Sequence, residues 1–141
     1  MLHLHDIESG YGAGQVLFGV SLSVPAGRVV SLMGRNGMGK TTTIRTIMGQ
    51  LPLTAGRISR FGNDQPDQLP FQIARLGLGL VPEGRQIFSN LDVTENLKTF
   101  YRPPRDGGGS HWHYERVLDL FPRLAERRDH AGNHLSGGEQ Q

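Results

Sequence analysis

A loop of glycine and polar residues, Gly34-Arg35-Asn36-Gly37-Met38-Gly39-Lys40-Thr41, fits the pattern G-x-x-x-x-G-K-S/T at every fixed position. In this pattern the glycines let successive backbone N–H groups point into one concavity, which binds phosphate. The apolar run Val29–Met33 precedes the loop and predicts a strand buried on both faces of a sheet. A helix is expected to begin near Lys40 and to end at Gly49. This order of strand, loop and helix favours a phosphate-binding loop over an ordinary glycine turn.

The predicted helix supplies both a packing face and a binding end. Its apolar residues Ile44, Ile47 and Met48 form one stripe, which we expect to face the sheet. Its N-terminus carries aligned peptide dipoles that attract anions. Lys40 is expected to reach the β- and γ-phosphates of a nucleotide, and Thr41 to ligate Mg²⁺ through its hydroxyl.

The bulk composition excludes several classes of protein. The 141 residues are enough for one domain with a core, and 36% hydrophobic with 20% charged residues is ordinary for a globular chain. The net charge of +2 comes without a run of Lys or Arg, which argues against nucleic-acid binding. The absence of cysteine excludes disulfides and thiolate metal sites. The N-terminus does not have the pattern of a signal peptide, and no stretch approaches the roughly 20 apolar residues of a membrane span.

Other segments predict further elements of an α/β fold. The strands expected from apolar patterning are Leu2–Ile7, one or two within Val16–Val24, Arg57–Phe61 and Leu78–Val81. The helices expected are Phe71–Leu76, one from Thr94 with Leu97 and Phe100 inward, and Trp112–Phe121 with Val117, Leu118 and Phe121 inward. Arg102–Ser110 is expected to be a connector. The six histidines form no convincing ligand set, so we expect no metal site besides that for Mg²⁺.

A second motif, Leu135-Ser136-Gly137-Gly138-Glu139, lies near the end of the sequence. Ser136 and Glu139 have the spacing of a capping box at the start of a helix. Gly137 and Gly138 allow close approach of a backbone to a phosphate group. The five residues together match more than an ordinary helix cap requires.

The two motifs, in this order and at this spacing, resemble the phosphate-binding loop and the signature motif of ATP-binding-cassette (ABC) transporter ATPases. The resemblance covers essentially the whole chain and implies an α/β P-loop NTPase core with a mixed sheet and a helical subdomain, of which the C-terminal part is missing. It implies that residues 1–85 and 130–141 belong to the nucleotide-binding core and residues 86–129 to the helical subdomain. ATP and Mg²⁺ are the implied cofactors.

The resemblance also implies roles for single residues. Tyr11 matches the aromatic residue that stacks on adenine, and Thr42 matches an additional phosphate contact. The segment Val81–Phe88 lies where the family has its Q-loop, which senses the transmembrane partner and contacts Mg²⁺ or water. Glu83 occupies the usual glutamine position, and Gln86 is a less favoured substitute. Met38 stands where the family usually has a small residue.

Three strings, Val81–Arg85, Thr94–Leu97 and Leu120–Leu124, are most similar to the branched-chain amino-acid importers of the family, with urea or short-amide importers as a close alternative. This implies a peripheral subunit at the cytoplasmic face of the inner membrane, bound to transmembrane permease subunits. It also implies a second ATP-binding subunit, packed head to tail, whose signature motif covers the ATP. Two alternatives stay open, namely a non-catalytic truncated ABC fragment and a soluble ABC ATPase without a role in transport.

The sequence stops at Gln141, before the place where the family has its Walker B strand and its switch histidine. No catalytic residue is therefore assigned, apart from Glu83 at the Q-loop position. Phosphoryl transfer depends on a metal clamp and a positioned water as well as on the phosphate loop. We expect the 141-residue chain alone to bind nucleotide weakly, to hydrolyse it little or not at all, and to be poorly soluble or oligomeric.

Overall fold

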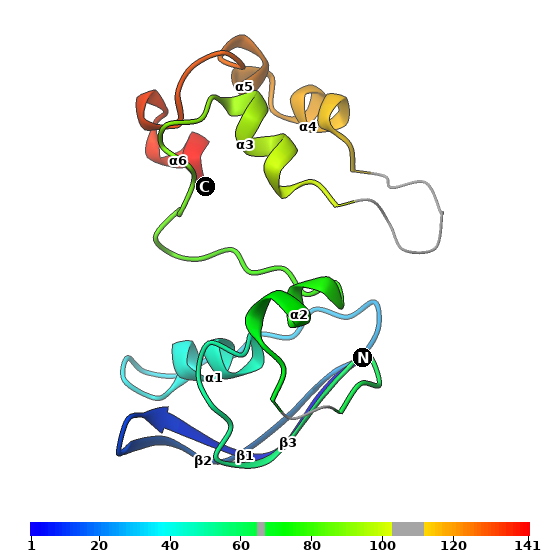
Figure 1. Cartoon of the computed structure of the whole chain (residues 1–141), viewed down its shortest axis with the longest axis vertical. Helices are drawn as coiled ribbons and strands as arrows, with labels where there is room; N and C mark the ends of the chain where they lie inside the picture. Colours follow the sequence, from blue (N-terminus) through cyan, green and yellow to red (C-terminus); the bar gives the residue numbers. More distant parts are fainter. Residues whose placement is uncertain (65–66, 103–111) are drawn as a thin grey trace. The chain divides into compact units, whose positions relative to one another are not determined.

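The computed structural model of the chain describes residues 1–64, 67–102 and 112–141, which form two compact units, Met1–Leu80 and Val81–Gln141 (Figure 1). The first contains β1 (Leu2–Tyr11), β2 (Gly14–Val24), α1 (Lys40–Ile47), β3 (Ala55–Arg60) and α2 (Pro70–Arg75). The second contains α3 (Val93–Phe100), α4 (Tyr114–Leu120), α5 (Pro122–Glu126), a 3₁₀ turn at Gly132–His134 and α6 (Gly137–Gln140).

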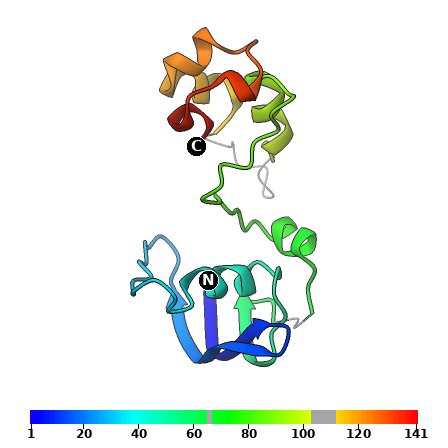
Figure 2. The same ribbon diagram turned by 90° about the vertical axis from the view of Figure 1, so that its left-hand side faces the viewer.

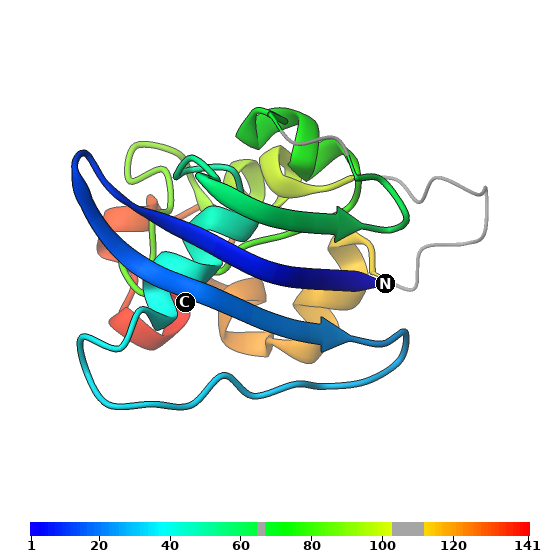
Figure 3. The ribbon, with the colours of Figure 1, turned by 90° about the horizontal axis from the view of Figure 1, so that it is seen from below.

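The first unit is built on an antiparallel sheet with the strand order β2-β1-β3 (Figure 3). β1 and β2 form a hairpin in which Tyr11 pairs with Gly14, and Gly12 supplies the positive φ of 56° that the tight turn needs. The three predicted strands in this region are confirmed, although β1 extends beyond Ile7 to Tyr11.

Helix α1 lies across one face of this sheet (Figure 2). The core between them consists of buried aliphatic side chains: Leu4, Ile7, Leu17, Ile47 and Ile58. Burial of this apolar surface is the main stabilising contribution, at about 25 cal/mol for each Å² removed from water. At the end of α1, Gly49 adopts a positive φ of 68°, as the predicted helix end requires.

The buried face of α1 differs from the predicted stripe. Ile47 and Met48 are buried as expected, but Ile44 is exposed, and Thr43 and Thr46 take the inward positions with Ile47. Both sets have the i, i+3, i+4 spacing of one helix face, and the buried face is rotated by one residue, about 100°, from the predicted one. The Thr46 hydroxyl lies 2.9 Å from both the Thr42 carbonyl oxygen and Ser9 Oγ, so the buried polar atom is satisfied.

The predicted strands at Val29–Met33 and Leu78–Val81 are wrong for this structure. Both segments are irregular, and the residues Val29 and Met33 are 97% and 86% exposed. A strand is held by hydrogen bonds to a neighbouring strand, and no strand among the described residues pairs with either segment. An apolar run by itself therefore does not produce a buried strand.

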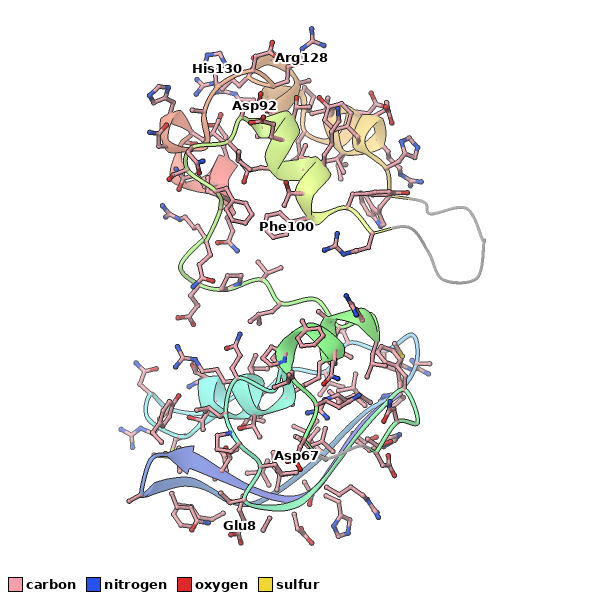
Figure 4. The ribbon with its side chains drawn as sticks, viewed as in Figure 1. Glu8, Asp67, Asp92, Phe100, Arg128 and His130 are labelled. Atoms are coloured by element: carbon pink, nitrogen blue, oxygen red, sulfur yellow. The ribbon has the colours of Figure 1, made fainter. Side chains whose placement is uncertain are left out.

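The second unit is held together around α3. Asp92 and Glu95 form a capping box, and the amides of Val93 and Thr94 donate to the carbonyl oxygens of His130 and Arg128 at 3.2 and 3.1 Å (Figure 4). The predicted helix from Thr94 is thus confirmed. Leu97 is half-buried, but the expected inward position of Phe100 is wrong, because the residue is 61% exposed and its ring stacks on Phe88 at 5.7 Å between centroids.

Asn96 is the polar centre of this unit. Its Oδ1 accepts from the Phe88 amide at 2.9 Å, and its Nδ2 donates to the carbonyl oxygens of Phe88 and Asp92 at 3.0 and 2.9 Å. The side chain is buried, so these hydrogen bonds take the place of those that the turn before α3 would otherwise make to water. The sequence pattern does not single Asn96 out, because its partners are backbone atoms of an irregular segment.

The predicted helix at Trp112–Phe121 is found as the shorter α4. Val117 and Leu118 are half-buried as expected, whereas Phe121 is exposed, because it ends α4 and begins α5 at Pro122. The predicted connector Arg102–Ser110 lies outside the described residues except for Arg102. The predicted division into residues 1–85 with 130–141 and residues 86–129 stays a prediction. No helix in the described part is long and apolar enough to cross a bilayer.

Candidate nucleotide-binding site

The glycine-rich loop curves around the ammonium group of Lys40. Lys40 Nζ donates to the carbonyl oxygens of Gly34 and Arg35 at 2.7 and 2.9 Å, and the Met38 amide donates to Arg35 at 3.2 Å. The positive charge of Lys40 thus lies against two carbonyl oxygens at the start of the loop. The surface position of residues 34–38 leaves the loop open to a ligand.

Two glycines give the loop its curvature. Gly37 and Gly39 both have a φ of 84°, in the left-handed region that costs other residues about 1–2 kcal/mol. Gly39 also packs closely on β2, since a Cβ placed on it would lie 2.8 Å from Leu17 Cδ2. The second glycine is therefore needed for packing as well as for its backbone angle.

The N-terminus of α1 faces the same loop. Within the described residues, the backbone amides of Gly37, Lys40 and Thr41 donate to no carbonyl oxygen. Free amides and the helix dipole together favour an anion at this end. The donors fit a phosphate chain, because phosphate oxygens accept several hydrogen bonds at once.

The three threonines after Lys40 differ in their surroundings. Thr41 is exposed, so its hydroxyl is accessible to a metal ion held beside the phosphates. Mg²⁺ usually keeps several waters and takes only one or two protein oxygens, and a single hydroxyl fits that requirement. Thr42 is buried and Thr43 donates to the Gly39 carbonyl oxygen at 2.9 Å, which makes Thr43 structural. The described residues contain no cluster of three His, Asp or Glu side chains suited to another metal.

Tyr11 comes from the end of β1 and lies beside the outer face of α1. The residue is 46% exposed, and Arg45 Nη1 donates to its hydroxyl at 3.3 Å. Hydrogen bonding to the Thr42 hydroxyl and, to a smaller extent, to Arg45 lowers the pKa of the Tyr11 phenol, against the opposing effect of burial. The structure thus brings Tyr11 to the helix that carries Lys40 and Thr41, as a nucleotide site requires.

The signature motif forms the predicted capping box at the start of α6. The Ser136 amide donates to Glu139 Oε2 at 2.7 Å, and the Glu139 amide donates to Ser136 Oγ at 3.4 Å. The Ser136 amide first, then the Ser136 hydroxyl and Arg127 at 3.5 Å, hold the pKa of the Glu139 carboxyl below its ordinary value. The Glu139 carboxyl is therefore ionised at neutral pH, and its hydrogen bond with Ser136 stabilises the turn of the motif itself.

Residues outside the motif also support it, and sequence reasoning missed them. Gln140 Nε2 donates to the carbonyl oxygens of Gly132 and Leu135, both at 3.1 Å. The guanidinium of Arg85 lies against Gly137, where an added Cβ would be 2.6 Å from Arg85 Nη1. The only available signal for Arg85 is its place in the predicted Q-loop segment.

The predicted site residues divide between the two units. Tyr11, Thr42 and residues 34–41 belong to the first unit, while Glu83, Ser136, Gly137, Gly138 and Glu139 belong to the second. Glu83 is exposed in an irregular segment. Its assignment to Mg²⁺ and that of the signature motif to a phosphate stay predictions. Sequence reasoning also missed Arg45, for which the spacing of one helical turn from Thr42 is a weak signal.

Known proteins that are similar to this chain are ATP-binding proteins of transport systems. The ABC transporter family profile matches residues 17–141. The chain is 38% identical to the high-affinity branched-chain amino acid transport ATP-binding protein BraG of Pseudomonas aeruginosa, covering 100% of this chain and 60% of BraG. It is 35% identical to the lipopolysaccharide export system ATP-binding protein LptB of Escherichia coli K12, covering 96% of this chain and 56% of LptB.

Among solved structures, the ATP binding subunit of an ABC transporter superposes with a TM-score of 0.80 at 33% identity, over 99% of this chain and 57% of that one. These similarities confirm the predicted fold class and the resemblance inferred from the two motifs. The chain spans less than two thirds of the length of the relatives it matches.

Proposed function

The chain belongs to the ABC transporter family, and from this premise we propose that it supplies the nucleotide-binding part of an ATPase subunit that powers an importer. The observation that carries the proposal is the pair of hydrogen bonds from Lys40 Nζ to the carbonyl oxygens of Gly34 and Arg35, at the N-terminus of α1. This contact has little use in packing, because the loop is exposed, but a cation beside a glycine-rich loop at a helix N-terminus suits a triphosphate.

Each part of the loop has a role in this proposal. The backbone amides of residues 34–41 and the dipole of α1 hold the phosphate oxygens, and Lys40 turns from the loop carbonyls to the β- and γ-phosphates. Thr41 gives its hydroxyl to Mg²⁺, with Glu83 as a further candidate from the Q-loop segment. Tyr11 stacks on adenine, and Thr42 adds a phosphate contact. When bound, Mg²⁺ neutralises part of the charge that develops on the phosphates.

The signature motif serves a second ATP-binding subunit. Ser136, Gly137, Gly138 and Glu139 form a rigid capped turn, and the two glycines leave room for the γ-phosphate of ATP held by the other subunit. The proposed assembly is therefore a head-to-tail dimer, bound to transmembrane permeases at the cytoplasmic face of the inner membrane. The similarity to BraG supports branched-chain amino acids as cargo.

One observation favours a second candidate, an ATPase subunit of an export system. LptB is nearly as similar to the chain as BraG, at 35% against 38% identity. Genes for two permeases and a periplasmic binding protein beside the coding sequence would support import. A neighbourhood of export genes would support the second candidate.

Hydrolysis needs more than the loop, because a metal clamp and a positioned water contribute as much. Among the described residues we assign no side chain to the attacking water. For the 141-residue chain alone we therefore propose nucleotide binding with slow hydrolysis or none. A turnover rate that Lys40→Ala abolishes would contradict this part of the proposal.

Nucleotide binding is tested by titrating the chain with ATP, with and without Mg²⁺, and following the heat of binding. Lys40→Ala is expected to weaken ATP binding by at least about tenfold, because a charge-assisted phosphate contact is lost. Lys98→Ala is the matched control, since Lys98 is the only other lysine and lies in the second unit. Equal affinities for the Lys40→Ala variant and the parent chain would overturn the proposed site.

A further inference from the structure

The edge of the Tyr11 ring is held by a residue of α1. Arg45 Nη1 donates to the Tyr11 hydroxyl at 3.3 Å, across 34 positions of the chain. No ion pair joins Arg45 to a carboxylate within the described residues, so Tyr11 is its specific polar partner there. The contact joins the end of β1 to the helix that begins with Lys40 and Thr41.

Tyr11 needs such a contact because of where it lies. It is the last residue of β1 and is followed by the turn at Gly12, and its ring is about half exposed. An aromatic side chain in this position has few neighbours to restrict its rotation. A hydrogen bond at the hydroxyl restricts the ring from its edge and leaves its face available for stacking.

We propose that Arg45 is a positioning residue for nucleotide base recognition, which holds the Tyr11 ring in the orientation that stacks on a purine. The proposal rests on the proposed function, and it adds a residue that neither motif contains. Arg45 and Lys40 are parts of the same helix, so the distance between the base platform and the phosphate loop is set by rigid structure.

The pKa of the Tyr11 phenol agrees with this contact. Side-chain hydrogen bonding, by Thr42 first and by Arg45 to a smaller extent, lowers this pKa against the opposing effect of burial. The geometric observation behind the proposal is the 3.3 Å hydrogen bond from Arg45.

The test compares ATP with inorganic tripolyphosphate, which offers the phosphates without a base. The full 141-residue chain and the variants Arg45→Gln, Arg45→Lys, Tyr11→Phe and Arg45→Gln/Tyr11→Phe are titrated with both ligands. Arg57→Gln is the control, because Arg57 is also exposed in the first unit but lies on β3, where its backbone pairs with His5.

Arg45→Gln and Tyr11→Phe are each expected to weaken ATP binding by about three- to tenfold, the range of one hydrogen bond to a charged donor at a partly exposed site. Tripolyphosphate affinity is expected to stay within about twofold, because Arg45 acts through the ring. The double variant should bind ATP no more weakly than the weaker single variant, since both remove the same contact. Arg45→Lys retains a donor and should recover most of the ATP affinity.

Three outcomes would overturn the positioning role: ATP affinity unchanged in Arg45→Gln, additive losses in the double variant, or an equal loss for tripolyphosphate. The last result would show that Arg45 acts as a general positive charge. Failure of the proposed function looks different, because the parent chain itself would then bind neither ATP nor tripolyphosphate.

Discussion

Arg60 Nε donates a 2.9 Å hydrogen bond to the carbonyl oxygen of Ile47, and Arg60 Nη2 lies 3.4 Å from the carbonyl oxygen of Thr46. A guanidinium from β3, only 3% exposed as a residue, thus closes the last turn of α1. Burial lowers the pKa of Arg60, and the partial negative charge at a helix C-terminus offsets that cost. The helix that carries Lys40 is therefore held at its far end by the sheet.

Arg60→Met is expected to reduce the free energy of unfolding of the first unit by about 2–4 kcal/mol, because two carbonyl oxygens lose a buried charged donor. Hydrogen exchange of the α1 amides, read by mass spectrometry, measures this loss. Arg57→Met is the control, since Arg57 is exposed on the same strand. Equal protection of α1 in both variants would show that Arg60 does not hold the helix.

Gly39→Ala is expected to destabilise the first unit more than Gly37→Ala. Both positions have a φ of 84°, so both substitutions carry backbone strain of about 1–2 kcal/mol. Only at Gly39 does the new Cβ also meet Leu17 Cδ2, at 2.8 Å, whereas the space at Gly37 is open. The difference between the two unfolding midpoints in urea isolates this contact. Identical midpoints would mean that Leu17 moves aside without cost.

Asn96→Ala is expected to lower the denaturant concentration at which the second unit unfolds. The expected loss in the free energy of unfolding is about 2–4 kcal/mol. The substitution leaves the Phe88 amide without its acceptor, and the carbonyl oxygens of Phe88 and Asp92 each lose one of two donors. Trp112 is the only tryptophan and lies in this unit, so its fluorescence reports the transition. Asn133→Ala, at an exposed asparagine of the 3₁₀ turn, should leave the free energy of unfolding within about 0.5 kcal/mol of that of the parent chain.

The turn at the signature motif is expected to loosen in acid. Because folding lowers the pKa of Glu139 below its ordinary value of 4.5, the stabilising effect is present in full above pH 4.5. It is lost as the pH falls through the lowered pKa. The chemical shift of the Ser136 amide, which donates to Glu139, should report a titration with a midpoint below 4.5.

Ser136→Ala is expected to raise that midpoint towards 4.5, because the hydroxyl contribution is removed while the backbone amide stays. Ser89→Ala, at an exposed serine in a turn of the same unit, serves as the control and should leave it unchanged. A midpoint at or above 4.5 in the parent chain would contradict the capping geometry.

Sequence reasoning succeeded where neighbours along the chain supply the structure. The glycines of the loop, the start of α1 at Lys40 and the capping box at Ser136 all depend on residues within about four positions of one another. It failed for Val29–Met33 and Phe100, because hydrophobicity predicts burial only where another element covers the side chain. The same reasoning predicted only part of the buried face of α1. Thr43 and Thr46 are polar, but they can be buried because their hydroxyls donate to backbone carbonyl oxygens.

Local chemistry alone was thus enough to predict a curved glycine-rich loop and a capped glycine turn, since positive φ angles and caps are properties of short segments. Contacts between distant segments required the folded structure. The pairing of Arg45 with Tyr11 and of Arg60 with Ile47 depends on how α1 lies across the sheet. That placement comes from burial of the shared apolar core, which is non-directional and leaves no mark on any single stretch of sequence.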